Sequence, residues 1–359
     1  MRNHKWICFL FIPSLSLASP SITNVTGTFF GQATDQIVVT ITGVDFSTKS
    51  PAAPVVFADF EDGTVNPTSL GIITAWNAND GPLISTTTKQ LINSSHSILG
   101  TWVSPSTSFS FQLKHISTFS FIYSFGRRYH EADLTGNQKV WRLHRADGGG
   151  TWVVSSSGDG VFLNEDCSGN QLNQFQDIQS KIDEGNFYTE EHIWSHGSYT
   201  GADWIVANGY WNYLVDGFSV QKSTSGDNCD SQSTEIRVWD NFSNVGVVDG
   251  AHLWMDDLYV DSTWSRVFIS TVSTWTENGT GGRREIQIPN AWSDTEVQVY
   301  FRQGEAQADE TWYMFVCDHT NSCNSNGFEI TIGESIFETE TDSFVGQGES
   351  VIKGTTEIR

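Results

Sequence analysis

The chain has 359 residues, with 42 Asp and Glu against 19 Lys and Arg, and a formal charge of −23 at pH 7. So large a negative charge excludes nucleic acid and anionic membrane surfaces as expected partners. It is compatible with calcium, which binds carboxylates, although an acidic surface also serves solubility alone. The 14 Trp and 23 Phe exceed what core filling requires in so polar a chain, and indicate exposed rings of the kind that stack on sugars.

Residues 1–18 have the pattern of a signal peptide. The basic start MRNHK precedes the apolar run WICFLFIPSLSLA, which is too short to cross a bilayer. Ser16, Leu17 and Ala18 then place small residues at both cleavage-determining positions. We therefore expect a secreted or cell-surface protein, without membrane insertion because no later run has the length of a spanning helix.

Residues 19–50 form a small predicted β segment. SPSITNVTG and IVVTITGVDF resemble the opening strands of the immunoglobulin-like IPT/TIG domain. The later strands of that family do not follow, so the resemblance implies a partial or strand-completed version and no binding role.

From residue 51 to residue 263, short β runs separated by turn residues recur, and no capped helical stripe appears. A weak helix candidate covers 171–182. Many short, turn-bounded strands predict one all-β sandwich. The strands are expected at 55–60, 108–113, 117–125, 139–145, 151–154, 191–195, 211–215 and 235–239.

The last strand of this region, within GAHLWMDDLYVDSTW at 250–264, alternates with period two. Its adjacent carboxylates, Asp256 and Asp257, must place one on the covered face. A buried carboxylate is costly unless it is paired, hydrogen-bonded or bound to a cation.

The two ends of the region carry a family resemblance. VFADFEDGT at 56–64 and LWMDDLYVD at 253–261 resemble the first and last strands of concanavalin-A-like and carbohydrate-binding-module jelly rolls. NQKVWRL, EEHIW and LVDG are similar to phrases of the same group, and LVDG resembles its short hairpin in laminin-G, legume-lectin and polysaccharide-lyase-like members. The resemblance implies that the two ends lie side by side and hold a structural calcium. Glu61, Asp62 and Asp257 are then the metal candidates; the alternative is that one carboxylate caps a turn while the others face water.

The region 264–333 is predicted to be a small immunoglobulin-like β-sandwich with strands at 266–269, 284–289, 296–301, 312–317 and 328–332. The remaining segment, 334–359, is acidic and turn-rich and is predicted to be a flexible tail.

Four cysteines follow residue 18, an even number suited to disulfides in an oxidising compartment. Cys317 and Cys323 have the spacing of a disulfide that closes a hairpin loop, and Cys167 and Cys229 form the remaining pair. Zinc ligation is the alternative, but the chain has no CxxC and no helical His pair, so disulfides are favoured.

Strand alternation predicts one open face of charged, imidazole and aromatic side chains on the jelly roll. On such a face rings stack on sugars, and Arg binds carboxylates or sulfates. An ordinary solvent-facing surface is the alternative. The residues expected to bind the ligand are Arg142, His144, Glu190, His192, Trp194, Trp211, Tyr213, Arg237 and Trp239.

Enzymatic signatures are mostly absent. No strand carries the closely spaced carboxylates of a retaining glycosidase, and the Arg-x-Glu-x-Arg and Gln-x-His strands of known lyases do not occur. Beta-elimination requires a charge neutraliser and a Tyr or His base, for which Arg142, His192, Tyr210 and Arg237 are candidates.

The prediction is a secreted polysaccharide-binding protein with a central jelly roll flanked by immunoglobulin-like β elements. One alternative is a polysaccharide lyase that acts on a uronate-containing glycan. Another is a structural surface or appendage protein, in which Trp194, Trp211 and Trp239 would be buried.

Overall fold

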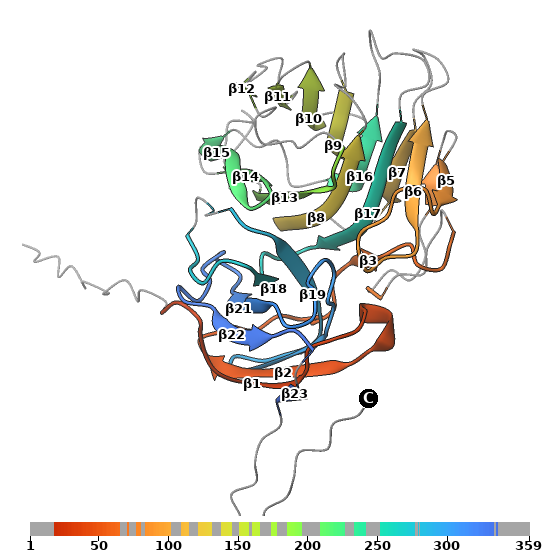
Figure 1. Cartoon of the computed structure of the whole chain (residues 1–359). Helices are drawn as coiled ribbons and strands as arrows, with labels where there is room; N and C mark the ends of the chain where they lie inside the picture. The colour runs from red at the N-terminus through yellow and green to blue at the C-terminus, as the bar shows by residue number, and fades with distance from the viewer. Residues whose placement is uncertain are drawn as a thin grey trace, which may run out of the picture.

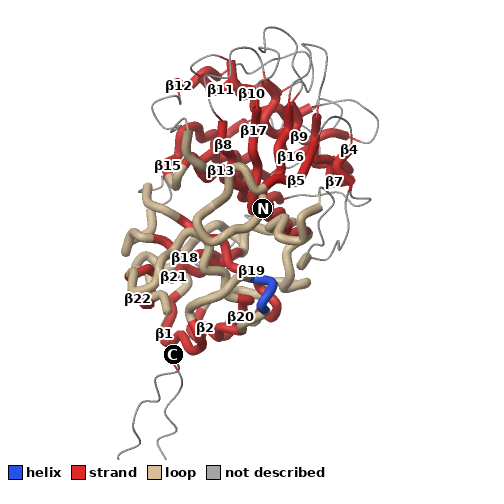
Figure 2. Tube along the Cα trace, turned by 45° about the vertical axis from the view of Figure 1, so that its right-hand side comes forward, coloured by secondary structure: helices blue, strands red, loops and turns tan. Residues whose placement is uncertain are grey.

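The computed structural model describes residues 18–64, 70–71, 77–79, 83–101, 109–114, 121–130, 138–145, 151–157, 160–165, 174–177, 185–195, 209–226, 233–241, 252–276, 279, 281–333 and 335–336. Throughout this part the regular structure is strand, apart from one 3-10 turn, η1 (Ala33–Asp35), blue in Figure 2. The predicted all-β fold is confirmed. None of the described segments is a helix long and apolar enough to cross a membrane. Most of the predicted signal peptide, the tail after residue 336, and Cys167 and Cys229 lie outside the described residues.

Two antiparallel sheets form a central sandwich of the jelly-roll type. The middle sheet has the order β15 (Phe218–Gly226), β14 (Gly209–Val215), β13 (Tyr188–Ser195), β8 (Phe121–His130), β17 (His252–Asp261), β6 (Ser97–Thr101) and β5 (Leu83–Thr86), and β3 (Val56–Ala58) also pairs with β17. The distal sheet has the order β12 (Gln174–Asp177), β11 (Gly160–Glu165), β10 (Thr151–Ser157), β9 (Gln138–Arg145), β16 (Ser233–Asn241), β7 (Phe109–Lys114) and β4 (Asn77–Asn79). Strand β12 shows that the weak helix candidate at 171–182 is wrong for its described residues.

The small unit combines both ends of the described chain. Its sheet has the order β22 (Phe328–Thr331), β21 (Thr311–Cys317), β18 (Arg266–Ser270), β19 (Arg284–Trp292), β20 (Glu296–Tyr300), β2 (Val38–Val44), β1 (Ser21–Thr28) and β23 (Ser335–Ile336). Strand β2 pairs with β20, and β1 pairs with β23. The segments 19–50 and 264–333 therefore share one sheet, and the sandwich is inserted between β2 and β18.

The core of the small unit explains this arrangement. Inward-facing residues of β2, among them Val39 and Ile41, are fully buried and alternate with half-buried or exposed neighbours. They pack in one cluster with Val297 and Val299 of β20 and with Trp312 of β21. Five of the buried residues of this cluster come from 25–46 and eleven from 267–332, so both segments contribute to one core.

The middle sheet is covered on the side of the small unit, and Figure 1 shows it between that unit and the distal sheet. Ile193 and Leu214 of the middle sheet join one buried cluster with Phe268, Ile286 and Phe315 of the small unit.

Buried ion pairs cross the same junction. Arg127 of β8 contacts Glu285 of β19 at 2.5 Å, and Arg284 of β19 contacts Glu191 of β13 at 2.9 Å. Lys49, which follows β2, contacts Asp261 of β17 at 2.6 Å. Because charges removed from water are costly to separate, these pairs favour one relative placement of the two units.

Strand β17 contains a bulge that the sequence pattern does not reveal. Asp256 pairs with Arg127, whereas Tyr259 pairs with Phe125, and Asp257 has a φ of 53°. The extra residue interrupts the period-two alternation. As a result both carboxylates are buried, with exposed fractions of 0% for Asp256 and 1% for Asp257.

Candidate functional site

The structure divides the predicted ligand face between two sheets. Glu190, His192 and Trp194 lie on β13, and Trp211 and Tyr213 lie on β14, all in the middle sheet. The other four residues, Arg142, His144, Arg237 and Trp239, lie on β9 and β16 of the distal sheet. The nine residues therefore do not form one face.

The five residues of the middle sheet are internal rather than exposed. Trp194, Trp211 and Tyr213 are at most 1% exposed, His192 is 3% exposed and Glu190 is 4% exposed. They are on the sheet face opposite Ile193, because residues alternate between faces along a strand. This correction removes them from an open sugar-binding groove.

Several of these buried side chains contact one another. Glu190 accepts a hydrogen bond from the hydroxyl of Tyr213 at 2.7 Å and pairs with Arg128 at 2.8 Å. The ring of His192 stacks on Tyr213 at a centroid distance of 4.6 Å. Burial, and then the positive charge of Arg128, hold the pKa of His192 well below its ordinary value. A buried neutral imidazole is a poor candidate for the base of a lyase, because a polysaccharide cannot reach it.

In the distal sheet, the register brings polar residues together. Arg237 of β16 lies opposite Arg142 of β9 on one side and Gln112 of β7 on the other. Two residues earlier on β16, Glu235 lies opposite His144 and Lys114. Opposed residues in an antiparallel ladder share a face, and so do residues two apart along a strand. We call these six residues, Gln112, Lys114, Arg142, His144, Glu235 and Arg237, the polar row.

The residues between or next to members of the polar row belong to the other face of the distal sheet and are apolar. They are Phe111, Leu113, Trp141, Leu143, Ile236 and Val238. This alternation is typical of an antiparallel sheet with one face on a core and one toward water. Trp239 is not in the row, because the β16–β7 register shifts between Val238 and Asp240.

The metal candidates are also rearranged. Asp62 accepts hydrogen bonds from the backbone and hydroxyl of Thr64, at 2.9 and 3.0 Å, and so caps a turn. Asp257 pairs with Arg302 and lies 3.9 Å from Nε of Arg127. All three candidates are therefore engaged by other protein groups, since Glu61 accepts from the backbone nitrogen and the hydroxyl of Ser95. In the described part of the chain, no three His, Cys, Asp or Glu side chains are grouped as a metal site.

Glu61 instead lies in an oxygen-rich cluster with Asp256. The hydroxyl oxygen of Ser94 contacts Glu61 Oε1, and lies 3.1 Å from Asp256 Oδ2 and 2.8 Å from the backbone oxygen of His96. One hydroxyl proton cannot serve three acceptors at once. Burial, and then the neighbouring Asp257, raise the pKa of Asp256 well above its ordinary value. Glu61 also accepts hydrogen bonds from the backbone nitrogen of Ser95, at 3.0 Å to Oε1 and 2.8 Å to Oε2. The cluster nevertheless brings together two carboxyl groups, a hydroxyl and a carbonyl, which are oxygen groups of the kind that calcium takes as ligands.

Tyr210, the remaining catalytic candidate, lies at the start of β14, in the middle sheet. Its ring is 5.1 Å from that of Trp264, at the junction with the small unit. The four catalytic candidates are thus split: Arg142 and Arg237 are neighbours, whereas His192 and Tyr210 lie elsewhere.

No protein-family model matches the sequence, and no curated protein matches it. Among solved structures, the chain is similar to the cellulose-induced protein Cip1, with 16% identity over 58% of this chain and 97% of that one, and a TM-score of 0.41. It is similar to the alginate lyase vAL-1 from Chlorella virus, with 12% identity over 52% and 92%, and a TM-score of 0.42. A third similarity is to domain 4 of AbnA, an extracellular arabinanase from Geobacillus stearothermophilus in complex with arabinotriose, with 12% identity over 58% and 92%, and a TM-score of 0.38.

Proposed function

We propose that this is an exported polysaccharide-binding protein whose polar row holds an anionic glycan. The observation that carries the proposal is the register that places Arg142 opposite Arg237. Guanidinium groups bind carboxylates and sulfates through paired hydrogen bonds. The row has three cationic residues and one carboxylate within a chain of net charge −23, so it is a local reversal of the overall charge.

Export is supported by two features of different kinds. The segment 1–18 has the pattern of a signal peptide. Cys317 and Cys323 form the predicted disulfide, and disulfides persist in oxidising compartments.

The binding test uses affinity electrophoresis in gels that contain alginate, polygalacturonate, a sulfated glycan or a neutral glucan. The wild-type protein should be retarded by at least one anionic glycan, and less so at high salt, because salt screens the attraction. The Arg142→Gln/Arg237→Gln variant should lose roughly tenfold or more in affinity, since each charge-assisted bond contributes about 1.5–3 kcal/mol. Arg283→Gln, which changes an exposed arginine of the small unit, is the matched control. The proposal would be rejected if the folded wild-type protein were not retarded in any of the gels. It would also be rejected if Arg142→Gln/Arg237→Gln and Arg283→Gln were retarded equally.

A lyase acting at the same row is the second candidate function, because His144 lies two residues from Arg142 on one face of β9. Abstraction of the proton next to a uronate carboxyl, with loss of the linked sugar, yields an unsaturated product that absorbs ultraviolet light. Product formation that disappears in His144→Asn would show a lyase. Retardation in the gel without product would show a binding protein.

We also propose that Glu61 and Asp256, with the Ser94 hydroxyl and the His96 carbonyl, hold a structural calcium. When bound, the ion would neutralise the buried carboxylate of Asp256 and tie the turn after β3 to β17. Calcium should raise the melting temperature of the wild-type protein, and this rise should vanish in Glu61→Gln but persist in Asp62→Asn. An equal rise in the wild-type protein and in Glu61→Gln would contradict this assignment.

A further inference from the structure

A groove with a volume of about 510 Å3 lies where the central sandwich meets the small unit. Its walls include three aromatic side chains, Tyr210, Trp264 and Trp275, and polar neutral side chains such as Thr276, Thr320 and Asn321. We propose that this groove, here called the seam groove, binds a neutral sugar residue. The site is separate from the polar row, which lies on the distal sheet.

The aromatic wall is fixed before any ligand arrives. The indole nitrogen of Trp264 donates to the backbone oxygen of Trp194 at 2.9 Å. Trp275 packs 5.4 Å from Phe268, and the guanidinium of Arg284 lies 4.8 Å from its ring. Rings held in place by buried neighbours lose little freedom on binding, and their faces match the apolar C–H faces of a pyranose.

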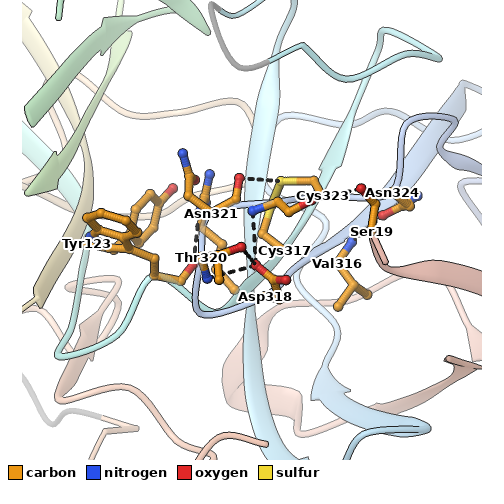
Figure 3. The surroundings of a disulfide bond; sticks show 12 residues. Ser19, Tyr123, Val316, Cys317, Asp318, Thr320, Asn321, Cys323 and Asn324 are labelled. Carbon is orange, nitrogen blue, oxygen red and sulfur yellow. Dashed lines mark hydrogen bonds between the residues drawn. A yellow bond between two sulfur atoms is a disulfide. The ribbon is translucent and has the colours of Figure 1, made fainter. Parts of the chain in front are cut away.

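The polar wall is a loop closed by the disulfide between Cys317 and Cys323 (Figure 3). Inside the loop, the carboxylate of Asp318 accepts from the backbone and hydroxyl of Thr320 at 2.8 and 2.7 Å, and from the backbone of Ser322 at 3.0 Å. These bonds define the position of the residue between them, Asn321, whose φ is 67°. The loop is therefore preorganised.

Asn321 carries the observation that points to a ligand. The residue is only 6% exposed, and within the described part of the chain its side-chain oxygen Oδ1 has no hydrogen-bond partner. A buried amide oxygen without a donor is unfavourable, and native proteins seldom retain one without a reason. The oxygen itself is covered, but Asn321 lines the groove, so a rotation of its amide toward the groove would let a ligand hydroxyl supply the missing donor.

The chemistry of the walls restricts the ligand class. Among the described residues that line the groove, no side chain carries a formal charge, so none of them compensates a carboxylate or sulfate. Aromatic faces together with hydroxyl and amide groups suit a ligand with apolar faces and many hydroxyls. The volume is in the usual range for small-ligand sites, about 300–1,000 Å3. A second hollow of about 410 Å3 shares Ser19 and Ser325 with the groove and offers room for a linked sugar unit.

Saturation-transfer NMR on the exported protein tests the proposal. The probes are methyl β-glycosides of glucose, galactose, mannose and xylose, their β-linked disaccharides, and methyl β-glucuronide as the charged comparison. At least one neutral probe should receive saturation on its ring C–H protons, and more strongly than the glucuronide. The Asn321→Gly substitution should weaken the affinity of the protein for that neutral probe roughly tenfold, because the substitution removes the side-chain amide. Glycine accepts the left-handed backbone without strain.

Two further variants make the result decisive. Asp309→Gly replaces another left-handed residue, with φ 66°, exposed and outside the groove, and should bind as the wild-type protein does. Tyr210→Leu removes a stacking ring and should lower affinity. The Arg142→Gln/Arg237→Gln variant, which should lose binding at the polar row, should give the same saturation transfer to neutral sugars as the wild-type protein. Failure of the polar-row proposal is therefore distinguishable from failure of the seam-groove proposal. The proposal is overturned by no transfer to any neutral probe, by preference for the glucuronide, or by equal affinity in Asn321→Gly and the wild-type protein.

Discussion

Buried ion pairs hold the central sandwich and the small unit in one relative position. Arg284 and Glu191 each have side chains that are 2% exposed, and their contact of 2.9 Å joins the small unit to the middle sheet. Glu191 also accepts from the hydroxyl of Tyr123 at 2.8 Å, which satisfies its second oxygen. A pair of this kind is stabilising only while both partners remain, because either charge alone is stranded in a medium of low polarity.

Glu191→Gln tests this dependence. The substitution keeps the shape of the side chain but leaves the charge of Arg284 buried and unpaired. We expect the free energy of unfolding to fall by about 3–5 kcal/mol in denaturant titrations. Glu310→Gln is the control, since Glu310 pairs with Arg283 at the surface, where exposed pairs contribute about 0–1 kcal/mol. Similar losses in the two variants would contradict the assigned role.

Glu285 makes stability depend on acid. Burial raises the pKa of Glu285, but Arg127 and Arg302 outweigh it, so that the pKa is below its ordinary value of 4.5. A carboxyl with a lowered pKa in the folded state contributes stability above its unfolded pKa, and loses it as the pH falls through the folded value. As the pH is lowered below about 4.5, the free energy of unfolding should therefore decrease. In Glu285→Gln this decrease with falling pH should be smaller. If urea unfolding at several pH values gave the same pH dependence of the free energy of unfolding in Glu285→Gln and in the wild-type protein, this linkage would be rejected.

Among the elements, the β14–β15 hairpin has a turn whose local sequence contributes directly to the junction between the sandwich and the small unit. Asp216 and Gly217 form its two-residue turn with φ values of 46° and 72°, the conformation that Asp-Gly favours in type I′ hairpins. The backbone oxygen of Gly217 accepts from Gly281 at 3.3 Å and from Arg284 at 3.3 Å. The turn therefore fixes the register of the hairpin and also contacts the small unit.

Gly217→Ala should be more damaging than an ordinary glycine substitution. A Cβ at this position would lie 2.8 Å from Nε of Arg284, in addition to the strain of a left-handed residue, about 1–2 kcal/mol. Gly185→Ala is the matched control, because Gly185 has a φ of 82° and nothing within 4 Å of the added carbon. The difference in melting temperature between the two variants isolates the contact with Arg284. No difference would show that this contact is easily relieved.

The strands of the sandwich also show what a period-two pattern in the sequence predicts and what it does not. On β9 and β16, alternation predicted a polar face, and the register places Arg142 opposite Arg237 and His144 opposite Glu235. On β13 and β14, the same alternation was interpreted as an open face, yet Trp194 and Trp211 are buried. A pattern separates the two faces of a strand, but it does not reveal what covers each face.

For the whole molecule, the main feature is a domain split by an insertion. Strands β1 and β2 complete the sheet of the small unit, and without them β20 would expose an unpaired edge and Val297 and Val299 would lose their partners Val39 and Ile41. The two halves meet only after the chain has traversed the whole sandwich.

A circular permutation tests this description. Residues 264–336 alone should remain unfolded by circular dichroism and amide proton dispersion, because their core is incomplete. The same residues joined to 19–48 should fold, since β23 pairs with β1. The linker must cover roughly 25 Å, because Ile336 lies opposite Gly27, eight residues from the start of 19–48. An isolated 264–336 that folds as well as the permuted chain would show that the N-terminal strands are dispensable.

Sequence alone determined the features that depend on neighbours in the chain. These are the all-β class, the Asp-Gly turn, the disulfide between Cys317 and Cys323, and the alternation on β9 and β16. Each follows from backbone preference, loop closure or the pleat of a strand. Tertiary structure decided which strands share a sheet, the burial of His192 and Trp194, the bulge that buries both Asp256 and Asp257, and the seam groove. These depend on contacts between residues far apart in the chain, and period-two patterning contains no information about the partner on the other side.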